Sequence, residues 1–277
     1  MGLLKWIKDT YMEGYNEAKE EQENSDKQLS DQSEKNKKLI PTLPMEKRLL
    51  CSVAAPYRVV IFGDWFTLFK DTDENDNHVP LHLHTFGKDL NLTEEKIGML
   101  KQSLKKDFQV YDRESALEMC KEMNSNWKYI KSVSDEFAEN MWEARVTFFR
   151  ETGIGGSYAL LLAMAGHSLT ASVDLGYLTE EEVFIAIKDM MYYFPLVFDD
   201  WKHFQQRFLE GNQNAKINRG VGSKVLEKYL GYLLTKSGSP WQWLEIKEVR
   251  KLKDKEPIVS ESISSNRRNE HLSIVKG

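Results

Sequence analysis

Apolar side chains recur every three or four positions through most of the chain, which is the spacing of one face of an α-helix. The repeat is clearest at residues 158–175 and, after Gly176, at residues 183–194. Gly176 stands where a helix C-terminus needs a glycine, and Thr179 with Glu182 three residues later has the spacing of a capping box. The pattern therefore predicts two helices joined by a tight turn.

Similar patterns predict further helices on both sides of this pair. Thr93 and Asp112 each precede a periodic segment and are of the residue types that cap helix N-termini. A helix that begins near Met45 is expected to end before Pro56, because the residue before a proline is steered away from helical angles. The other predicted helices span residues 93–108, 112–123, 200–211 and 223–234.

One stretch has a different character. Residues 57–69 are β-branched and aromatic, and residues 78–86 alternate between apolar and polar side chains. This pattern is typical of strands, and Pro80 would assign the second strand to an edge. The expected fold is therefore mainly α: a single multi-helix domain with a small β-hairpin near residues 59–86 and polar tails.

The polar tails set the predicted domain boundaries. Leu3, Ile7 and Tyr11 share one face of a predicted amphipathic helix, and a polar run follows it that buries too little apolar surface to offset the entropy of ordering. The organisation expected is a helix and polar linker at 1–40, a helical globular domain at 41–256 and a disordered tail at 257–277.

Composition narrows the function. The 277 residues carry 38 basic and 43 acidic side chains, a formal net charge of −5. Because nucleic-acid binding needs a basic stripe, no nucleic acid is expected as a partner. Two cysteines, Cys51 and Cys120, are too few for a disulfide scaffold, which favours the cytoplasm. No transmembrane segment or signal peptide is expected.

Three segments of the C-terminal half, GYLTEEE, DWKHFQQRFLEG and SPWQWLEI, resemble the YbeU/YbeR-type bacterial domain of unknown function. The resemblance covers roughly residues 100–246. It implies a cytoplasmic, mainly helical bacterial protein with no assigned activity. The bulky side chains of the motif are explained at least as well by packing as by function. The motif residues are Gly176, Tyr177, Leu178, Trp201, Phe204, Phe208, Gly211, Pro240 and Trp241.

A candidate metal site lies in the predicted hairpin. On an extended strand His82 and His84 point the same way, so that with His78 they could reach one zinc or similar divalent ion. An edge strand facing solvent also accommodates histidines that bind nothing. No other cofactor is predicted.

A candidate catalytic cleft involves two predicted helices. His167 and Asp174 share one helix face, and His203 and Arg207 share the polar face of another. If these helices are neighbours, a histidine could act as general base while the arginine holds an anionic group. The alternative is that all four make isolated surface contacts.

The sequence therefore supports two hypotheses. The first is a non-enzymatic protein-interaction domain, of adaptor, regulatory or toxin-neutralising type, whose N-terminal helix or exposed aromatic residues bind another bacterial protein or a second copy of the chain. Only Lys5 and Lys8 flank the apolar face of that helix, which disfavours peripheral membrane contact. The second is a hydrolase-type enzyme that uses the histidine-rich hairpin or the His/Arg cleft.

Overall fold

The computed structural model describes residues 27–28, 30–62, 79–138, 142–217 and 221–253, and in this part every regular element is a helix. The predicted fold class, a mainly α single domain, is confirmed. The α-helices are α2 (Met45–Phe62), α4 (Glu94–Phe108), α5 (Arg113–Ala138), α6 (Trp142–Glu151), α7 (Gly153–Asp174), α8 (Glu180–Val197), α9 (Trp201–Asn214), α10 (Val221–Thr235), α11 (Pro240–Trp243) and α12 (Ile246–Lys253). Short 3₁₀ helices are η1 (Ile40–Thr42), η2 (Leu81–Leu83) and η3 (Gly87–Asp89).

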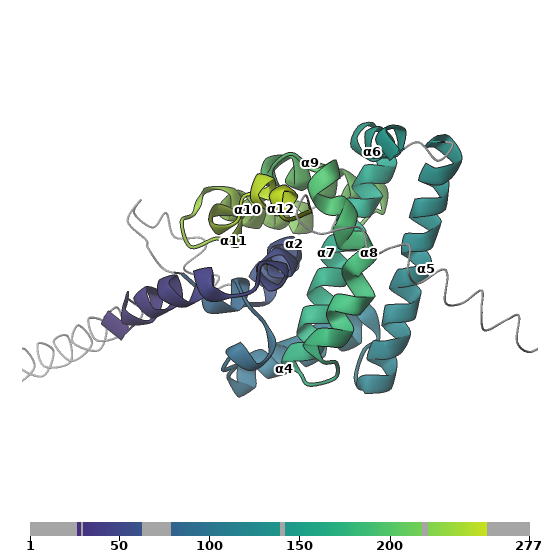
Figure 1. Cartoon of the computed structure of the whole chain (residues 1–277). Coiled ribbons are helices and arrows are strands. Elements are labelled where there is room, and N and C mark those ends of the chain that lie inside the picture. The colour runs from purple at the N-terminus through teal and green to yellow at the C-terminus, as the bar shows by residue number, and fades with distance from the viewer. Residues whose placement is uncertain (1–26, 29, 63–78, 139–141, 218–220, 254–277) are drawn as a thin grey trace, which may run out of the picture.

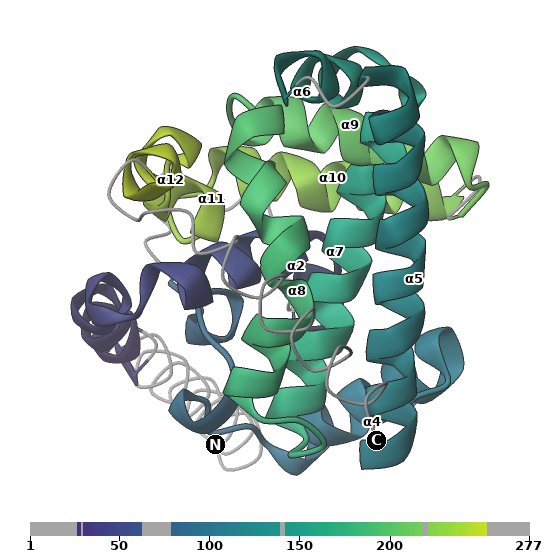
Figure 2. The ribbon, with the colours of Figure 1, turned by 45° about the vertical axis from the view of Figure 1, so that its right-hand side comes forward.

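Helix α7 is the centre of the domain. It contacts α2, α4, α5, α6, α8 and α9, and Figures 1 and 2 show α5 and α8 running alongside it while α9 lies near its upper end. The sequence of α7 fits this place, because it is almost free of charge and rich in Gly, Ala and Ser. Its small side chains allow neighbouring helices to approach closely on several sides.

Two glycines allow close backbone approaches to α7 or within its surroundings. A Cβ atom added to Gly211 of α9 would lie 2.1 Å from the carbonyl oxygen of Gly156 in α7, and one added to Gly155 of α7 would lie 1.8 Å from the carbonyl oxygen of Phe149 in α6. Real Cβ atoms never come this close to a backbone oxygen. Glycine at these positions is therefore a requirement of helix packing.

The turn between α7 and α8 agrees with the prediction. Gly176 adopts a positive φ of 75°, which glycine reaches at little steric cost. The Thr179 hydroxyl accepts the Glu182 N–H, and the Glu182 carboxylate accepts the Thr179 N–H, so both halves of the capping box are present. Local turn chemistry therefore ends one helix and begins the next.

The predicted end of α2 before Pro56 is wrong. Helix α2 continues through Pro56 to Phe62, although proline cannot donate the hydrogen bond that the Ser52 carbonyl would accept in a regular helix. The indole Nε1 of Trp241 donates to that carbonyl at 2.8 Å. A distant residue thus satisfies the group that the proline leaves free.

The predicted β-hairpin is also wrong where the structure describes it. Residues 57–62 belong to α2, and residues 81–83 form the 3₁₀ helix η2; residues 63–78 lie outside the described part. In the β-branched run that suggested a strand, Val59 is buried in the core and Val60 and Ile61 are partly buried against it. Tertiary burial has overridden local strand propensity.

Part of the predicted linker is ordered and docked. Residues 30–39 are helical, and the buried side chains of Ser33 and Asn36 bind the backbone of Val79. Asn36 Nδ2 donates to the Val79 carbonyl at 2.7 Å, and the Val79 N–H donates to Ser33 Oγ at 3.0 Å. The amphipathic helix predicted around Leu3 and the tail at 257–277 lie outside the described residues.

None of the helices in the described part combines the length and the apolar character that a bilayer crossing demands.

Candidate functional site: an acidic pocket beside α5

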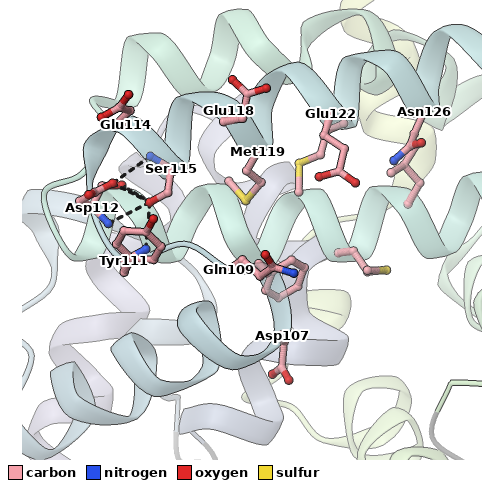
Figure 3. A pocket seen from close by; sticks show the side chains of 14 residues that line it. Asp107, Gln109, Tyr111, Asp112, Glu114, Ser115, Glu118, Met119, Glu122 and Asn126 are labelled. Atoms are coloured by element: carbon pink, nitrogen blue, oxygen red, sulfur yellow. Dashed lines mark hydrogen bonds between the residues drawn. The ribbon is translucent and has the colours of Figure 1, made fainter.

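A pocket of about 580 Å³ opens between α5, α7 and the segment that links α4 to α5 (Figure 3). We call it the α5 pocket. Its volume falls in the range of small-molecule and side-chain binding sites. The lining residues are Asp107, Phe108, Gln109, Tyr111, Asp112, Glu114, Ser115, Glu118, Met119, Glu122, Met123, Asn126, Leu161 and Met164.

The floor of the α5 pocket is apolar and soft. Met119 and Met123 of α5 are buried, and Leu161 and Met164 of α7 are half-buried beside them. Figure 3 shows Met119 pointing from α5 toward α7. Methionine is unbranched and polarisable, so a floor of this kind adapts to apolar groups of different shape.

The rim of the α5 pocket is acidic. Glu114, Glu118 and Glu122 follow one another at four-residue intervals along α5, while Asp107 stands on the α4 side (Figure 3). Together with Asp112 this gives five carboxylates, and none of the described side chains that line the pocket is basic. The pocket therefore has a negative potential that is not neutralised within its own walls.

Two of the rim carboxylates are unpaired. Neither Glu114 nor Glu122 forms an ion pair with any described residue. Glu118 pairs with Lys121 one turn later at 2.8 Å, with both side chains more than 70% exposed, so this pair contributes little to stability. A cation from outside could displace Lys121 at small cost.

Asp112 caps the N-terminus of α5. Its carboxylate accepts the Ser115 hydroxyl at 2.6 Å and the Ser115 N–H at 2.8 Å, which caps the first turn of α5. These hydrogen bonds lower the pKa of Asp112. The N-cap that the sequence predicts at Asp112 is thus present, and it fixes where the glutamate row begins.

The arrangement is suited to an amphipathic cation. A ligand with an apolar body and positive groups along one side could bury the body on the methionine floor and place the charges against the rim. Sequence reasoning missed this site, although Glu114, Glu118 and Glu122 are spaced so that they share one helix face. The pattern identifies the carboxylate row, but only the fold shows that α7 closes a floor beside it.

No family model, curated protein or solved structure matches this chain. The resemblance to the YbeU/YbeR-type domain therefore stays a prediction.

The four residues of the candidate cleft do not lie around one cavity. His167 is buried and packs its ring near Tyr57 and Phe108, at 5.8 and 5.9 Å between ring centroids. Burial lowers its pKa to about 3, and its Nδ1 has no hydrogen-bond partner in the described part. Such a histidine is neutral and closed to substrate.

The other three cleft residues have separate partners. The Asp174 carboxylate pairs with Arg58, and His203 lies at the N-terminus of α9 beside Asp199, with 3.6 Å between Nδ1 and the carboxylate. Arg207 binds Glu210 at 2.6 Å and the Thr152 carbonyl. Each side chain serves local packing or ion pairing, and no described contact joins the two histidines.

The structure describes two of the three predicted metal ligands, and each has other contacts. The His82 ring packs against Phe62 at a tilt of 40°, whereas His84 is buried, with its Nε2 2.9 Å from the Gly238 carbonyl. Burial lowers the pKa of His84 to about 4. His78 lies outside the described residues, and within them no three His, Cys, Asp or Glu side chains are grouped as metal ligands.

The motif residues of the resemblance hold helices together. Trp201 and Trp241 stack with 5.3 Å between ring centroids and 4° between planes, and Phe204 meets both edge-on. Leu178, Phe208, Gly211 and Pro240 are also buried, whereas Gly176 and Tyr177 lie at the exposed turn. These side chains line no part of the α5 pocket.

Proposed function

We propose that this chain is a non-enzymatic protein-interaction domain of the bacterial cytoplasm, and that it engages a basic segment of a partner protein at the α5 pocket. The observation that carries the proposal is the pocket itself, a methionine-lined floor beside two carboxylates that have no ion-pair partner among the described residues. Soft apolar floors with a charged rim are characteristic of surfaces that bind peptide segments. A domain of this kind would act as an adaptor, a regulator or a neutralising partner.

The cysteines support a reducing compartment. Cys51 is buried, and burial raises the pKa of its thiol to about 12. Cys120 is a half-buried free thiol whose pKa is also raised, mainly by burial. Two unreactive thiols without a disulfide between them fit a cytoplasmic protein.

The test is affinity capture with three forms of the full chain. The pocket variant carries Glu118→Gln and Glu122→Gln, which remove two charges at exposed positions without changing shape. The control carries Glu136→Gln, an exposed glutamate of the same helix that does not line the pocket. A stoichiometric partner that is retained by the wild type and the control but lost with the pocket variant is expected. Equal capture by all three forms would overturn the pocket as the binding site.

A fourth form tests the role predicted for the N-terminal helix. Residues 1–26 are deleted rather than 1–40, because Ser33 and Asn36 bind Val79 and belong to the folded domain. If the N-terminal helix carries the binding, as the sequence suggested, this deletion abolishes capture and the pocket variant does not. Retained capture after the deletion would leave the α5 pocket as the binding site.

A further inference from the structure

We infer that the occupant of the α5 pocket is one amphipathic α-helix of a partner protein, which lies along α5 with a row of lysine or arginine side chains against Glu114, Glu118 and Glu122. This inference rests on the proposed function and specifies the recognition element. It follows from the shape of the groove, from its charge and from the elements that form its walls.

The shape is elongated along α5. The lining residues of α5 run from Glu114 to Asn126, which corresponds to roughly 18 Å of helix length at 1.5 Å per residue. The three rim glutamates recur about every 6 Å along this length, since four residues separate them. A helix laid beside α5 that carries cations four residues apart presents them at the same interval.

The floor matches the apolar face of the same helix. Met119 and Met123 on one wall and Leu161 and Met164 on the other leave a trough whose floor is apolar. An occupant with leucine-like side chains three and four residues apart would place all of them on this trough. Its basic side chains would then extend from the flank of the apolar face toward the glutamate row.

The walls favour a helix over an extended peptide. α5 and α7 satisfy their backbone hydrogen bonds internally, so they offer no free edge to a strand. An extended peptide in this groove would leave its own N–H and C=O groups to water or side chains, and those that became buried would be costly. A helix enters with its backbone already satisfied.

The charge on the occupant is set by the rim. Glu114 and Glu122 are without ion-pair partners in the described part, and the Glu118–Lys121 pair is exposed and exchangeable. A row of two or three cations gains three close carboxylates together with Asp107 on the opposite side. Attraction of this kind is strong at low ionic strength and is screened as salt is added.

The experiment titrates the full chain into fluorescein-labelled synthetic peptides and follows anisotropy at low and at physiological salt. The first peptide is an 18-residue amphipathic helix with leucines on one face and lysines four residues apart on its flank. The second has the same composition but carries its lysines opposite the leucines. The third is the first peptide with one central proline, which breaks the helix. Unlabelled spermidine is titrated as a competitor.

The first peptide is expected to bind, and Glu118→Gln with Glu122→Gln is expected to weaken its binding about five- to tenfold at low salt, because each exposed ion pair supplies at most about a factor of five. Glu136→Gln is expected to leave binding unchanged. The second and third peptides are expected to bind far more weakly than the first, and spermidine is expected to compete only by screening, as sodium chloride of equal ionic strength does.

Four outcomes overturn the inference. Equal binding of the second peptide shows that the lysine row is not matched to α5, and equal binding of the third shows an extended occupant. Saturable displacement of the first peptide by spermidine, at concentrations where sodium chloride of equal ionic strength has no effect, shows a site for small polycations. Failure of every ligand to bind rejects the helix outright. Pocket-dependent capture of a partner could survive any of these results, so the helix can fail while the proposed function stands.

Discussion

Arg58 of α2 and Asp174 of α7 form an ion pair that is entirely closed to solvent, with 3.0 Å between Nη1 and Oδ2. The guanidinium also donates to the carbonyls of His82 and Thr85 and to the Thr170 hydroxyl. The second oxygen of Asp174 accepts the Gly87 N–H at 2.7 Å. One buried pair therefore ties two helices to the segment that precedes α4.

Replacement of either partner is expected to be costly, because it leaves the other charge buried and unpaired. Arg58→Met or Asp174→Asn should each reduce the free energy of unfolding by about 3–5 kcal/mol. The double variant should lose less than the sum, since no lone charge remains. Urea unfolding followed by circular dichroism measures all three. A loss below about 1 kcal/mol in either single variant would contradict the assigned role.

Two buried histidines predict acid sensitivity. Burial lowers the pKa of His84 from 6.5 to about 4 and that of His167 to about 3, so the unfolded chain binds protons that the folded chain refuses. The stability that these neutral histidines provide is complete above pH 6.5 and is lost as the pH falls toward 4 and then 3. Between pH 6.5 and about 4, the unfolding free energy of a His84→Gln variant should depend less steeply on pH than that of the wild type. The difference in slope should correspond to about one proton taken up on unfolding. An unchanged slope would count against the buried, neutral state.

Glu182 titrates with a depressed pKa of about 2, first because of its hydrogen bond to Arg113 and then because it accepts the Thr179 N–H. The stability that ionised Glu182 contributes to the fold is complete above its usual pKa of 4.5 and is lost as the pH falls through about 2. Glu182→Gln should therefore lower the Tm at pH 7, with a difference from wild type that shrinks below pH 4.5. Glu181→Gln, at an exposed position in the same turn, is the control. A difference independent of pH would refute the ionic origin.

Replacement by alanine should have opposite effects on stability at two glycines, Gly211 at the contact between α7 and α9 and Gly231 in α10. Gly211→Ala must push the helices apart, since its Cβ would lie 2.1 Å from the Gly156 oxygen, and should cost about 3 kcal/mol. Gly231→Ala in α10 meets no atom within 4 Å and should stabilise the chain by about 0.5–1 kcal/mol through helix propensity. Thermal unfolding of the two variants measures both effects. Equal changes in Tm would argue against the close packing of α9 on α7.

The bond from Trp241 to the Ser52 carbonyl can be tested as a double-mutant cycle. Trp241→Phe leaves that buried carbonyl without a donor and should cost about 1–3 kcal/mol for the lost bond alone. Pro56→Ala restores the helical N–H that the carbonyl would otherwise accept. If the indole replaces that N–H, Trp241→Phe should be less damaging in the Pro56→Ala background. Equal losses in both backgrounds would show that the indole does not compensate for the proline.

The elements that sequence predicted well are those decided locally. Thr179, Glu182 and Gly176 determine a helix boundary through contacts within a few residues, and the structure places that boundary where the pattern does. The helix end predicted at Pro56 is wrong because the missing hydrogen bond is replaced from residue 241. The strand predicted around Val59 is wrong because its preference for strands yields to burial under other helices.

The candidate sites could not be judged from the sequence for a related reason. Sequence places His167 and His203 on helix faces, but only packing decides which faces meet, and here each histidine meets different neighbours. His84 reads as a free ligand in the sequence and is a buried hydrogen-bonding group in the fold. The glutamates of the α5 pocket can be recognised from their four-residue spacing, whereas part of the floor comes from α7, which is distant in sequence.

The proline in α2 also has a consequence for the order in which the domain assembles. Ser52 and Trp241 are separated by 189 positions. The Ser52 carbonyl can therefore accept the indole N–H only after almost the whole described chain has been synthesised. During synthesis on the ribosome, α2 would lack this hydrogen bond until α11 has been made and the Trp241 indole donates to the Ser52 carbonyl. The hydrogen bond that replaces the one missing at Pro56 is thus donated by α11, one of the last helices of the described part.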